Sequence, residues 1–117
     1  MIPEVGDKSI RVTRSDIAAA FGSVGVAPGD TIMFHSSLSS MGTVAGGPEA
    51  VIDGCLDAVG PAGTVAVPTL CNWKPEDQPF VFARWSPETS PSYVGRITET
   101  LRLRPGAVRI DHATHSV

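Results

Sequence analysis

Residues 31–70 read TIMFHSSLSSMGTVAGGPEAVIDGCLDAVGPAGTVAVPTL and carry the clearest secondary-structure signals of the chain. Its start predicts a buried strand over 31–38, because the apolar residues there do not alternate with polar ones. A helix is predicted over 46–60, with an apolar stripe formed by Val51, Ile52, Cys55, Leu56 and Val59. A second buried strand is predicted over 63–70. A strand, a helix and a strand in this order indicate parallel strands joined by a right-handed crossover.

The residues before this stretch predict one more helix. The chain is expected to be loosely docked up to Arg11, and the helix is expected over 13–26. Thr13 is a natural N-cap for it, and Asp16, three residues later, fits the second half of a capping box.

The residues after the stretch predict a third helix and a third strand. The helix is expected over 90–106, with Ser90 as its cap and Pro91 at its first position. The strand is expected over 107–117 and runs into a polar tip. This order of elements indicates a layered α/β/α fold with a mainly parallel central sheet, incomplete in this chain and forming a single domain over residues 1–117.

Composition excludes several classes of protein. Hydrophobic residues make up 42% of the chain and charged residues 18%, which is the balance of a globular protein rather than a disordered one. The net charge of −3 argues against a nucleic-acid binder, which normally carries a basic surplus. No apolar run is long enough to span a bilayer and the first residues lack a secretory pattern, so no membrane partner and a cytoplasmic location are expected. Cys55 and Cys71 are expected to be reduced thiols, and the histidine spacing predicts no metal site.

Residues 35–47, HSSLSSMGTVAGG, form a polar loop that carries no acid, lysine or arginine. In an open α/β sheet, ligands bind beyond the carboxyl ends of the strands, where the next helix presents unpaired N–H groups and a partial positive charge. Small serine and glycine residues let a phosphate or pyrophosphate approach those groups closely. The loop matches neither GxxxxGK[ST] nor GxGxxG, and an ordinary strand-to-helix connection is the alternative.

Residues 111–117, DHATHSV, place two histidines, a threonine and a serine at the end of the last predicted strand. A solvated strand terminus is the alternative to a binding edge. A serine hydrolase is not favoured, because His115 and Ser116 are neighbours in a predicted strand and their side chains would point to opposite faces.

Residues 71–90 predict a long irregular loop rich in aromatic and acidic side chains. These side chains either line the wall of a pocket for a cationic, sugar-like substrate or form a small separate core under the loop. The residues expected on the substrate side are Trp73, Glu76 and Asp77, accompanied by Phe80, Phe82, Trp85 and Glu88.

Taken together, these stretches resemble the aminoglycoside 3-N-acetyltransferase family, also called the antibiotic N-acetyltransferases. The resembling segments are GVAPGDTIMFHSSLSSMG (25–42), GGPEAVIDGCLDAVGPAGTVAVPT (46–69) and SPSYVGRITETLRLRPGAVRIDHATHSV (90–117), in the family order. The resemblance implies transfer of acetyl from acetyl-coenzyme A to an amine of an aminoglycoside, as in antibiotic resistance. It also implies that the first and last of these segments hold the coenzyme A diphosphate and pantetheine arm, through His35, Ser36, Ser37, Leu38, Ser39, Ser40, Gly42, Thr114, His115, Ser116 and Val117.

The chain also departs from the family pattern. Many members carry HPTHS where this chain has HATHS, with Ala113, and members are considerably longer. The resemblance implies that the catalytic histidine and its acidic partner lie downstream of Val117, so the chain is expected to be a fragment or a truncated product without the catalytic base. Self-association or a complementing C-terminal chain is then expected to cover the open sheet edge. The alternative function is a non-catalytic α/β module that binds a coenzyme A-like phosphorylated ligand or a partner chain.

Overall fold

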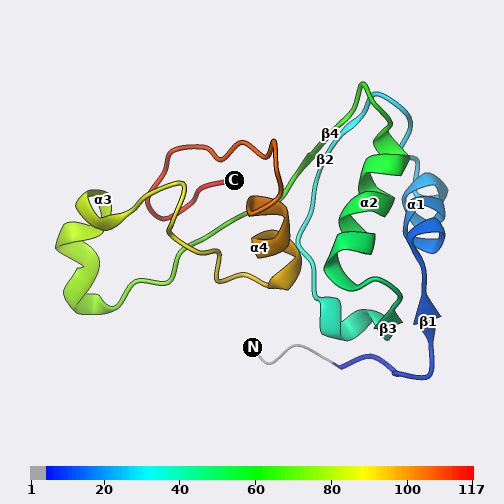
Figure 1. The fold of residues 1–117 in the computed structure, drawn as a ribbon, viewed down its shortest axis with the longest axis horizontal. Helices are drawn as coiled ribbons and strands as arrows, with labels where there is room; N and C mark the ends of the chain where they lie inside the picture. Colours follow the sequence, from blue (N-terminus) through cyan, green and yellow to red (C-terminus); the bar gives the residue numbers. More distant parts are fainter. Residues whose placement is uncertain (1–4) are drawn as a thin grey trace.

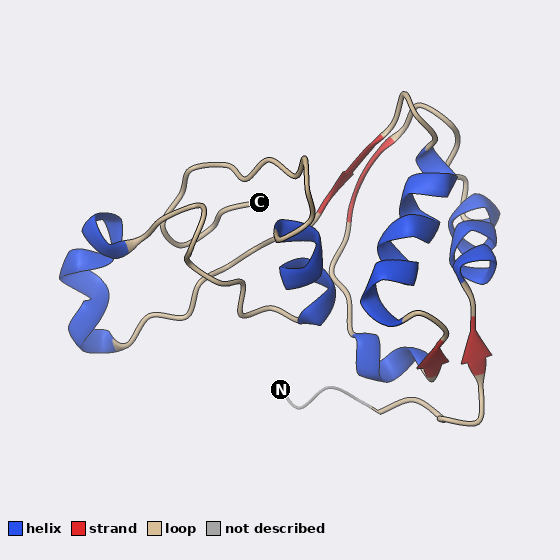
Figure 2. Ribbon diagram, in the orientation of Figure 1, coloured by secondary structure: helices blue, strands red, loops and turns tan. Residues whose placement is uncertain are grey.

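The computed structural model describes residues 5–117 and shows two parallel strand pairs arranged around a central helix (Figures 1 and 2). β1 (Arg11–Val12) pairs with β3 (Thr43–Val44), and β2 (Thr31–Met33) pairs with β4 (Thr64–Ala66). Both pairs are parallel, which confirms the predicted α/β class. In the view of Figure 1, β2 and β4 run between the central helix and the last helix of the chain.

The two longest helices, α1 (Arg14–Ser23) and α2 (Gly47–Val59), lie in the first half of the chain, and the other helical segments of the described residues have four to seven residues each. The shorter segments are η1 (Leu38–Met41), η2 (Pro75–Phe80), α3 (Val81–Arg84) and α4 (Arg96–Arg102), where η marks a 3-10 helix. None of the helices within residues 5–117 is long and apolar enough to cross a membrane.

The predicted capping box at the start of α1 is confirmed. The Asp16 amide donates to Thr13 Oγ1 at 3.2 Å, and the Thr13 amide donates to the Asp16 carboxylate at 2.8 Å. Each side chain therefore satisfies a backbone N–H that the first turn of a helix leaves without a partner.

The core is built on α2, the helix that the sequence predicts most strongly. Val51, Ile52 and Cys55 are at most 1% exposed and cluster with Ile97 of α4. Leu56, which was predicted to belong to the buried stripe, is 38% exposed, so the prediction is wrong for this residue. It follows Cys55 directly and therefore lies about 100° further round the helix, beyond the face that packs on the core.

The packing of α1 on α2 depends on Gly54. A Cβ at this position would lie 2.6 Å from the Ile17 Cβ and 2.8 Å from the Arg14 carbonyl oxygen. The absence of a side chain therefore sets how closely the two helices approach.

The segment before β1 is held in place rather than loosely docked. The Gly6 amide donates to the Ser39 carbonyl at 2.9 Å, and Lys8 Nζ donates to the Gly42 carbonyl at 3.1 Å. The expectation of a loosely docked start is therefore wrong from Gly6 onward, and residues 1–4 lie outside the described part of the chain.

The predicted third strand, residues 107–117, is wrong. The segment is an irregular loop that turns back on itself, and the Ile110 amide donates to the Val117 carbonyl at 2.9 Å. Val108 and Ile110 suggested a strand, but they are 90% and 61% exposed. No strand of the described chain pairs with them in a ladder.

The predicted third helix begins later than expected. α4 starts at Arg96, after Gly95 with a φ of 128°, and not at Pro91. Ser90 does not cap it, because its hydroxyl accepts a hydrogen bond from the Ser86 amide at 2.9 Å. Residues 71–90 are likewise not wholly irregular, since they contain η2 and α3, which lie at the far end of the molecule from α1 (Figure 1).

Candidate functional site

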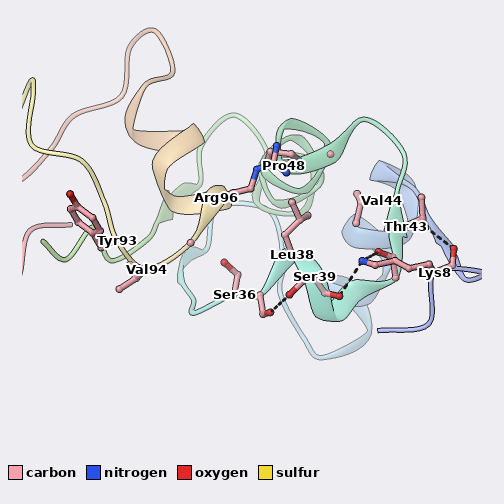
Figure 3. A pocket seen from close by; sticks show the side chains of 14 residues that line it. Lys8, Ser36, Leu38, Ser39, Thr43, Val44, Pro48, Tyr93, Val94 and Arg96 are labelled. Atoms are coloured by element: carbon pink, nitrogen blue, oxygen red, sulfur yellow. Dashed lines mark hydrogen bonds between the residues drawn. The ribbon is translucent and has the colours of Figure 1, made fainter. Parts of the chain in front are cut away.

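An open pocket of about 750 Å³ lies where the loop after β2 meets the starts of α2 and α4 (Figure 3). Residues far apart in the sequence come together here. The lining consists of Lys8, Ser36, Ser37, Leu38, Ser39, Gly42, Thr43, Val44, Gly47, Pro48, Tyr93, Val94, Gly95 and Arg96.

The serine hydroxyls of the loop differ in what they bind. Ser40 Oγ donates to the Ser37 carbonyl at 2.8 Å, and Ser37 Oγ lies 3.3 Å from Ser39 Oγ. Ser36 Oγ is buried and has no hydrogen-bond partner within residues 5–117. Since a buried polar group without a partner costs about 1–3 kcal/mol, Ser36 is the hydroxyl with most to gain from a ligand.

The start of α2 faces this pocket through Gly47 and Pro48. Its N-cap, Gly46, has a φ of 86° and provides no side-chain hydrogen bond to the first turn. The first N–H groups of the helix are therefore without a side-chain cap, and the helix dipole places a partial positive charge there. Both features favour an anion.

Two cationic side chains also line the pocket, and no acidic residue does so within the described chain. Lys8 Nζ donates to the carbonyls of Gly42 at 3.1 Å and Ser39 at 3.3 Å, on the right in Figure 3. The Arg96 side chain lies near Pro48 and forms no hydrogen bond or ion pair within residues 5–117 (Figure 3). The net local charge is therefore positive, although the whole chain carries −3.

Sequence reasoning missed both cations. Lys8 lies in the segment that was expected to be loose, and the pairing of β1 with β3 together with its own bonds to residues 39–43 brings it to the loop. Arg96 was expected inside a helix, whereas it stands at the first position of α4. No local pattern indicates either placement.

The structure brings together one of the two predicted coenzyme A segments at this pocket. Ser36, Ser37, Leu38, Ser39 and Gly42 line it, whereas His35 and Ser40 belong to the same loop without lining it.

The residues of the second predicted segment lie elsewhere. Val117 lines a separate groove of about 320 Å³ along β4. Ser116 is fully buried, and its Oγ lies 2.9 Å from Thr69 Oγ1. Thr114 Oγ1 lies 2.6 Å from Nδ1 of the exposed His115. Ser116 thus bonds a threonine rather than a histidine, and the roles of Thr114, His115, Ser116 and Val117 stay predictions.

The predicted substrate-side residues line neither the serine-rich pocket nor the groove along β4. Trp73 Nε1 donates to the Ala113 carbonyl at 2.9 Å, and Asp77 forms an ion pair with Arg84. Glu76 stands in the first turn of η2. Phe80 and Phe82 are 50% and 75% exposed, so they do not form a closed core.

The two cysteines are free, as the sequence predicted. Burial raises the pKa of the Cys55 thiol to about 11. Cys71 is half-buried, and its sulfur lies 3.6 Å from the Pro91 carbonyl oxygen. Within residues 5–117, no group of three or more histidine, cysteine, aspartate or glutamate side chains could hold a metal ion.

Comparison with known proteins gives a consistent result. Residues 33–117 match the family model described as aminoglycoside 3-N-acetyltransferase. The chain is 40% identical to aminoglycoside N(3)-acetyltransferase VII of Streptomyces paromomycinus and 37% identical to aminoglycoside N(3)-acetyltransferase VIII of Streptomyces fradiae. Each alignment covers 86% of this chain and 40% of the relative, so the chain spans about 40% of the length of these curated relatives.

Solved structures agree. The aminoglycoside acetyltransferase AAC(3)-Xa is similar with a TM-score of 0.78 and 42% identity, over 93% of this chain and 43% of that one. The binary complex of AAC-IIIb with CoASH has a TM-score of 0.76 and 30% identity, over 92% of this chain and 45% of that one. The room-temperature neutron/X-ray structure of AAC-VIa bound to sisomicin has a TM-score of 0.78 and 29% identity, over 92% of this chain and 45% of that one.

Proposed function

Since this chain belongs to the aminoglycoside 3-N-acetyltransferase family, we propose that its serine-rich loop, residues 35–42, binds acetyl-coenzyme A for acetyl transfer to an aminoglycoside amine. Support comes from relatives named as aminoglycoside N(3)-acetyltransferases and from similar structures with CoASH and with sisomicin. An antibiotic-resistance activity in the cytoplasm follows from this proposal, with acetyl-coenzyme A as the only cosubstrate.

The observation that carries the proposal is the chemistry of the pocket. It combines an uncapped helix start, the unpartnered Ser36 hydroxyl and the side chains of Lys8 and Arg96, without an acidic side chain from the described residues. Coenzyme A presents a diphosphate and a further phosphate on the ribose. Backbone N–H groups at a helix start bind such anions, and the two cations add attraction at longer range.

The proposed reaction is an acyl transfer by direct attack. The neutral amine nitrogen adds to the thioester carbonyl, and a general base takes one proton from that nitrogen. The C–S bond then breaks, so that the coenzyme A thiolate leaves as the amide forms. Backbone N–H groups would stabilise the oxyanion of the tetrahedral intermediate. No histidine or carboxylate of the described chain lines the pocket, so we assign the general base to no residue within 5–117.

That lack of a base in the pocket favours a second candidate, a module that binds coenzyme A without turnover. The two are separated by a pair of measurements. Calorimetry with coenzyme A tests binding, and mass spectrometry tests whether acetyl-coenzyme A and sisomicin give acetylated sisomicin. Binding with product supports the transferase, whereas binding without product supports the second candidate. Absence of any binding contradicts both.

The aminoglycoside contacts are proposed for the segment 71–90, through Trp73, Glu76 and Asp77. An aminoglycoside is polycationic, so carboxylates and aromatic faces suit it. The Asp77 carboxylate is currently paired with Arg84, and a bound amine would have to compete with that guanidinium.

We also propose that a second copy of the chain covers the groove along β4. This groove is lined by Val108 and Ile110, which are 90% and 61% exposed, and β4 has a strand neighbour on one side only within the described residues. An apolar surface beside an open strand edge favours pairing between chains. Light scattering after size-exclusion chromatography is expected to give the molar mass of a dimer. The Val108→Lys substitution should shift this mass toward that of the monomer. A monomer at all concentrations would contradict this, and a dimer only on addition of a complementing chain would assign the groove to that chain.

A further inference from the structure

The Arg109 guanidinium stands at a junction of three chain segments. Its Nε donates to Thr69 Oγ1 at 3.1 Å and to Ser116 Oγ at 3.0 Å, and its Nη2 donates to the Thr69 carbonyl at 2.9 Å. Its Nη1 donates to the carbonyls of Pro87, at 3.2 Å, and of Ser90. Nη2 also donates to Cys71 Sγ at 3.6 Å, so the N–H groups of one side chain bond five residues, which lie 7 to 40 positions away in the sequence.

Arg109 shares with Arg11 and Arg96 the lack of an acidic partner within residues 5–117, but only its guanidinium, among these three, donates hydrogen bonds to the described chain. Arg14, Arg84, Arg102 and Arg104 all form ion pairs, whereas Arg109 forms none within residues 5–117. Its charge is met by carbonyl and hydroxyl oxygens and by the face of Trp85, at 5.2 Å from the ring centre. A planar fork with five N–H donors suits this task, because the three donors of a lysine cannot reach the same set of oxygens.

The bonded residues belong to the two segments that carry the predicted site. Thr69 leads from β4 into the substrate-side segment 71–90, and Pro87 and Ser90 end that segment. Ser116 belongs to the predicted pantetheine channel and is fully buried. A second bond joins the same two segments, from Trp73 Nε1 to the Ala113 carbonyl at 2.9 Å.

We propose that Arg109 is a positioning residue that fixes residues 114–117 against the segment 71–90, so that the channel for the pantetheine arm has one shape. This inference rests on the proposed coenzyme A function. Neither residues 114–117 nor the segment 71–90 lines the serine-rich pocket, and the lining residue nearest in sequence to an Arg109 contact is Tyr93, three residues after Ser90. Loss of the guanidinium is therefore expected to weaken the contacts of residues 114–117 with the pantetheine arm. The contacts between the serine-rich pocket and the phosphates should change much less.

Two ligands separate these parts. Coenzyme A contains the pantetheine arm, whereas 3′-phospho-ADP carries the same nucleotide and phosphates without it. Calorimetry compares the affinity for each ligand in the unaltered chain, in Arg109→Gln and in Arg109→Lys. Arg14→Gln is the matched control, since Arg14 also bonds side chains distant in sequence, at Asp57 and Asp53, but lies on α1.

We expect Arg109→Gln to bind coenzyme A about tenfold more weakly, since several hydrogen bonds that order the channel are lost, while its affinity for 3′-phospho-ADP changes by less than about twofold. Arg109→Lys should fall between Arg109→Gln and the unaltered chain, and it decides the test if Arg109→Gln does not fold. Arg14→Gln should keep the ratio of the two affinities unchanged.

The inference is overturned if the Arg109 variants keep the ratio of the two affinities unchanged. Equal weakening of both affinities, as a loss of overall stability would cause, is one such result. The proposed function fails separately: an unaltered chain that binds neither ligand contradicts it and removes the basis of the inference. An unaltered chain that binds both ligands equally well keeps phosphate recognition and refutes the role of residues 114–117.

Discussion

Replacing Ser36 by aspartate tests phosphate recognition most sharply within the pocket. Ser36 lines the pocket, and its hydroxyl is buried without a partner in the described chain. Aspartate would place a negative charge where the proposed ligand carries its own. Asparagine has nearly the same shape and no charge, so Ser36→Asn controls for the added bulk.

The size of the effect follows from Coulomb's law. For a carboxylate about 5 Å from a phosphate in an open pocket, with an effective dielectric constant of about 40, repulsion is roughly 1.7 kcal/mol per unit charge. A diphosphate with about two charges raises this to roughly 3 kcal/mol, which corresponds to on the order of a hundredfold weaker binding. Salt screens part of the repulsion, so the difference should shrink as ionic strength rises.

The assay is calorimetric titration of coenzyme A into Ser36→Asp and Ser36→Asn, after thermal unfolding has shown that both variants fold. We expect Ser36→Asn to bind coenzyme A and Ser36→Asp to bind it on the order of a hundredfold more weakly. Equal affinities in the two variants would refute the idea that the phosphates lie beside Ser36.

Three further predictions concern the scaffold. Gly54→Ala should lower the free energy of unfolding by about 1–3 kcal/mol in urea titrations, because its Cβ would lie 2.6 Å from a side-chain carbon of α1; an unchanged midpoint would contradict the close packing of α1 on α2. In the native chain, iodoacetamide should alkylate Cys71 much faster than Cys55, whose burial raises its pKa to about 11, and mass spectrometry showing equal labelling would refute this. The hydrogen bond from Arg102 lowers the pKa of Glu99 from its ordinary value of 4.5, so the stability it provides is present above that value and is lost as pH falls through the lower folded pKa. Glu99→Gln should therefore lose less stability than the unaltered chain on acidification below pH 4.5, and an identical pH profile would contradict the pairing.

Elements fixed by neighbouring residues could be predicted from the sequence. The capping box of α1 joins Thr13 and Asp16, three residues apart, and the buried stripe of α2 follows from helical spacing. The serine-rich loop could also be placed near a helix start, because only three residues, Thr43 to Ala45, separate it from Gly46, the N-cap of α2.

Features that depend on distant contacts could not be predicted. Lys8 reaches the pocket only through carbonyls more than thirty residues away, and Arg109 bonds Thr69 forty residues away. No spacing rule in a single sequence connects such positions.

The two errors near the end of the chain have physical causes. Val108 and Ile110 alternate as in a strand, but they line a groove along β4 and form no ladder with it in the described chain. Pro91 suits the first turn of a helix, but the Ser92 amide donates to the Glu99 carboxylate at 2.8 Å. This bond holds the residues before Gly95 as a loop that folds over the start of α4.

The proposed function requires coenzyme A to bind across the serine-rich loop and the start of α2. The most direct measurement is the change in backbone amide NMR shifts of the chain on titration with coenzyme A. We expect the largest changes at Ser36–Gly42 and at Gly47, with further changes at Thr114–Val117. Shifts that leave Ser36–Gly42 and Gly47 unmoved, or that gather only along the β4 groove, would contradict the proposed function.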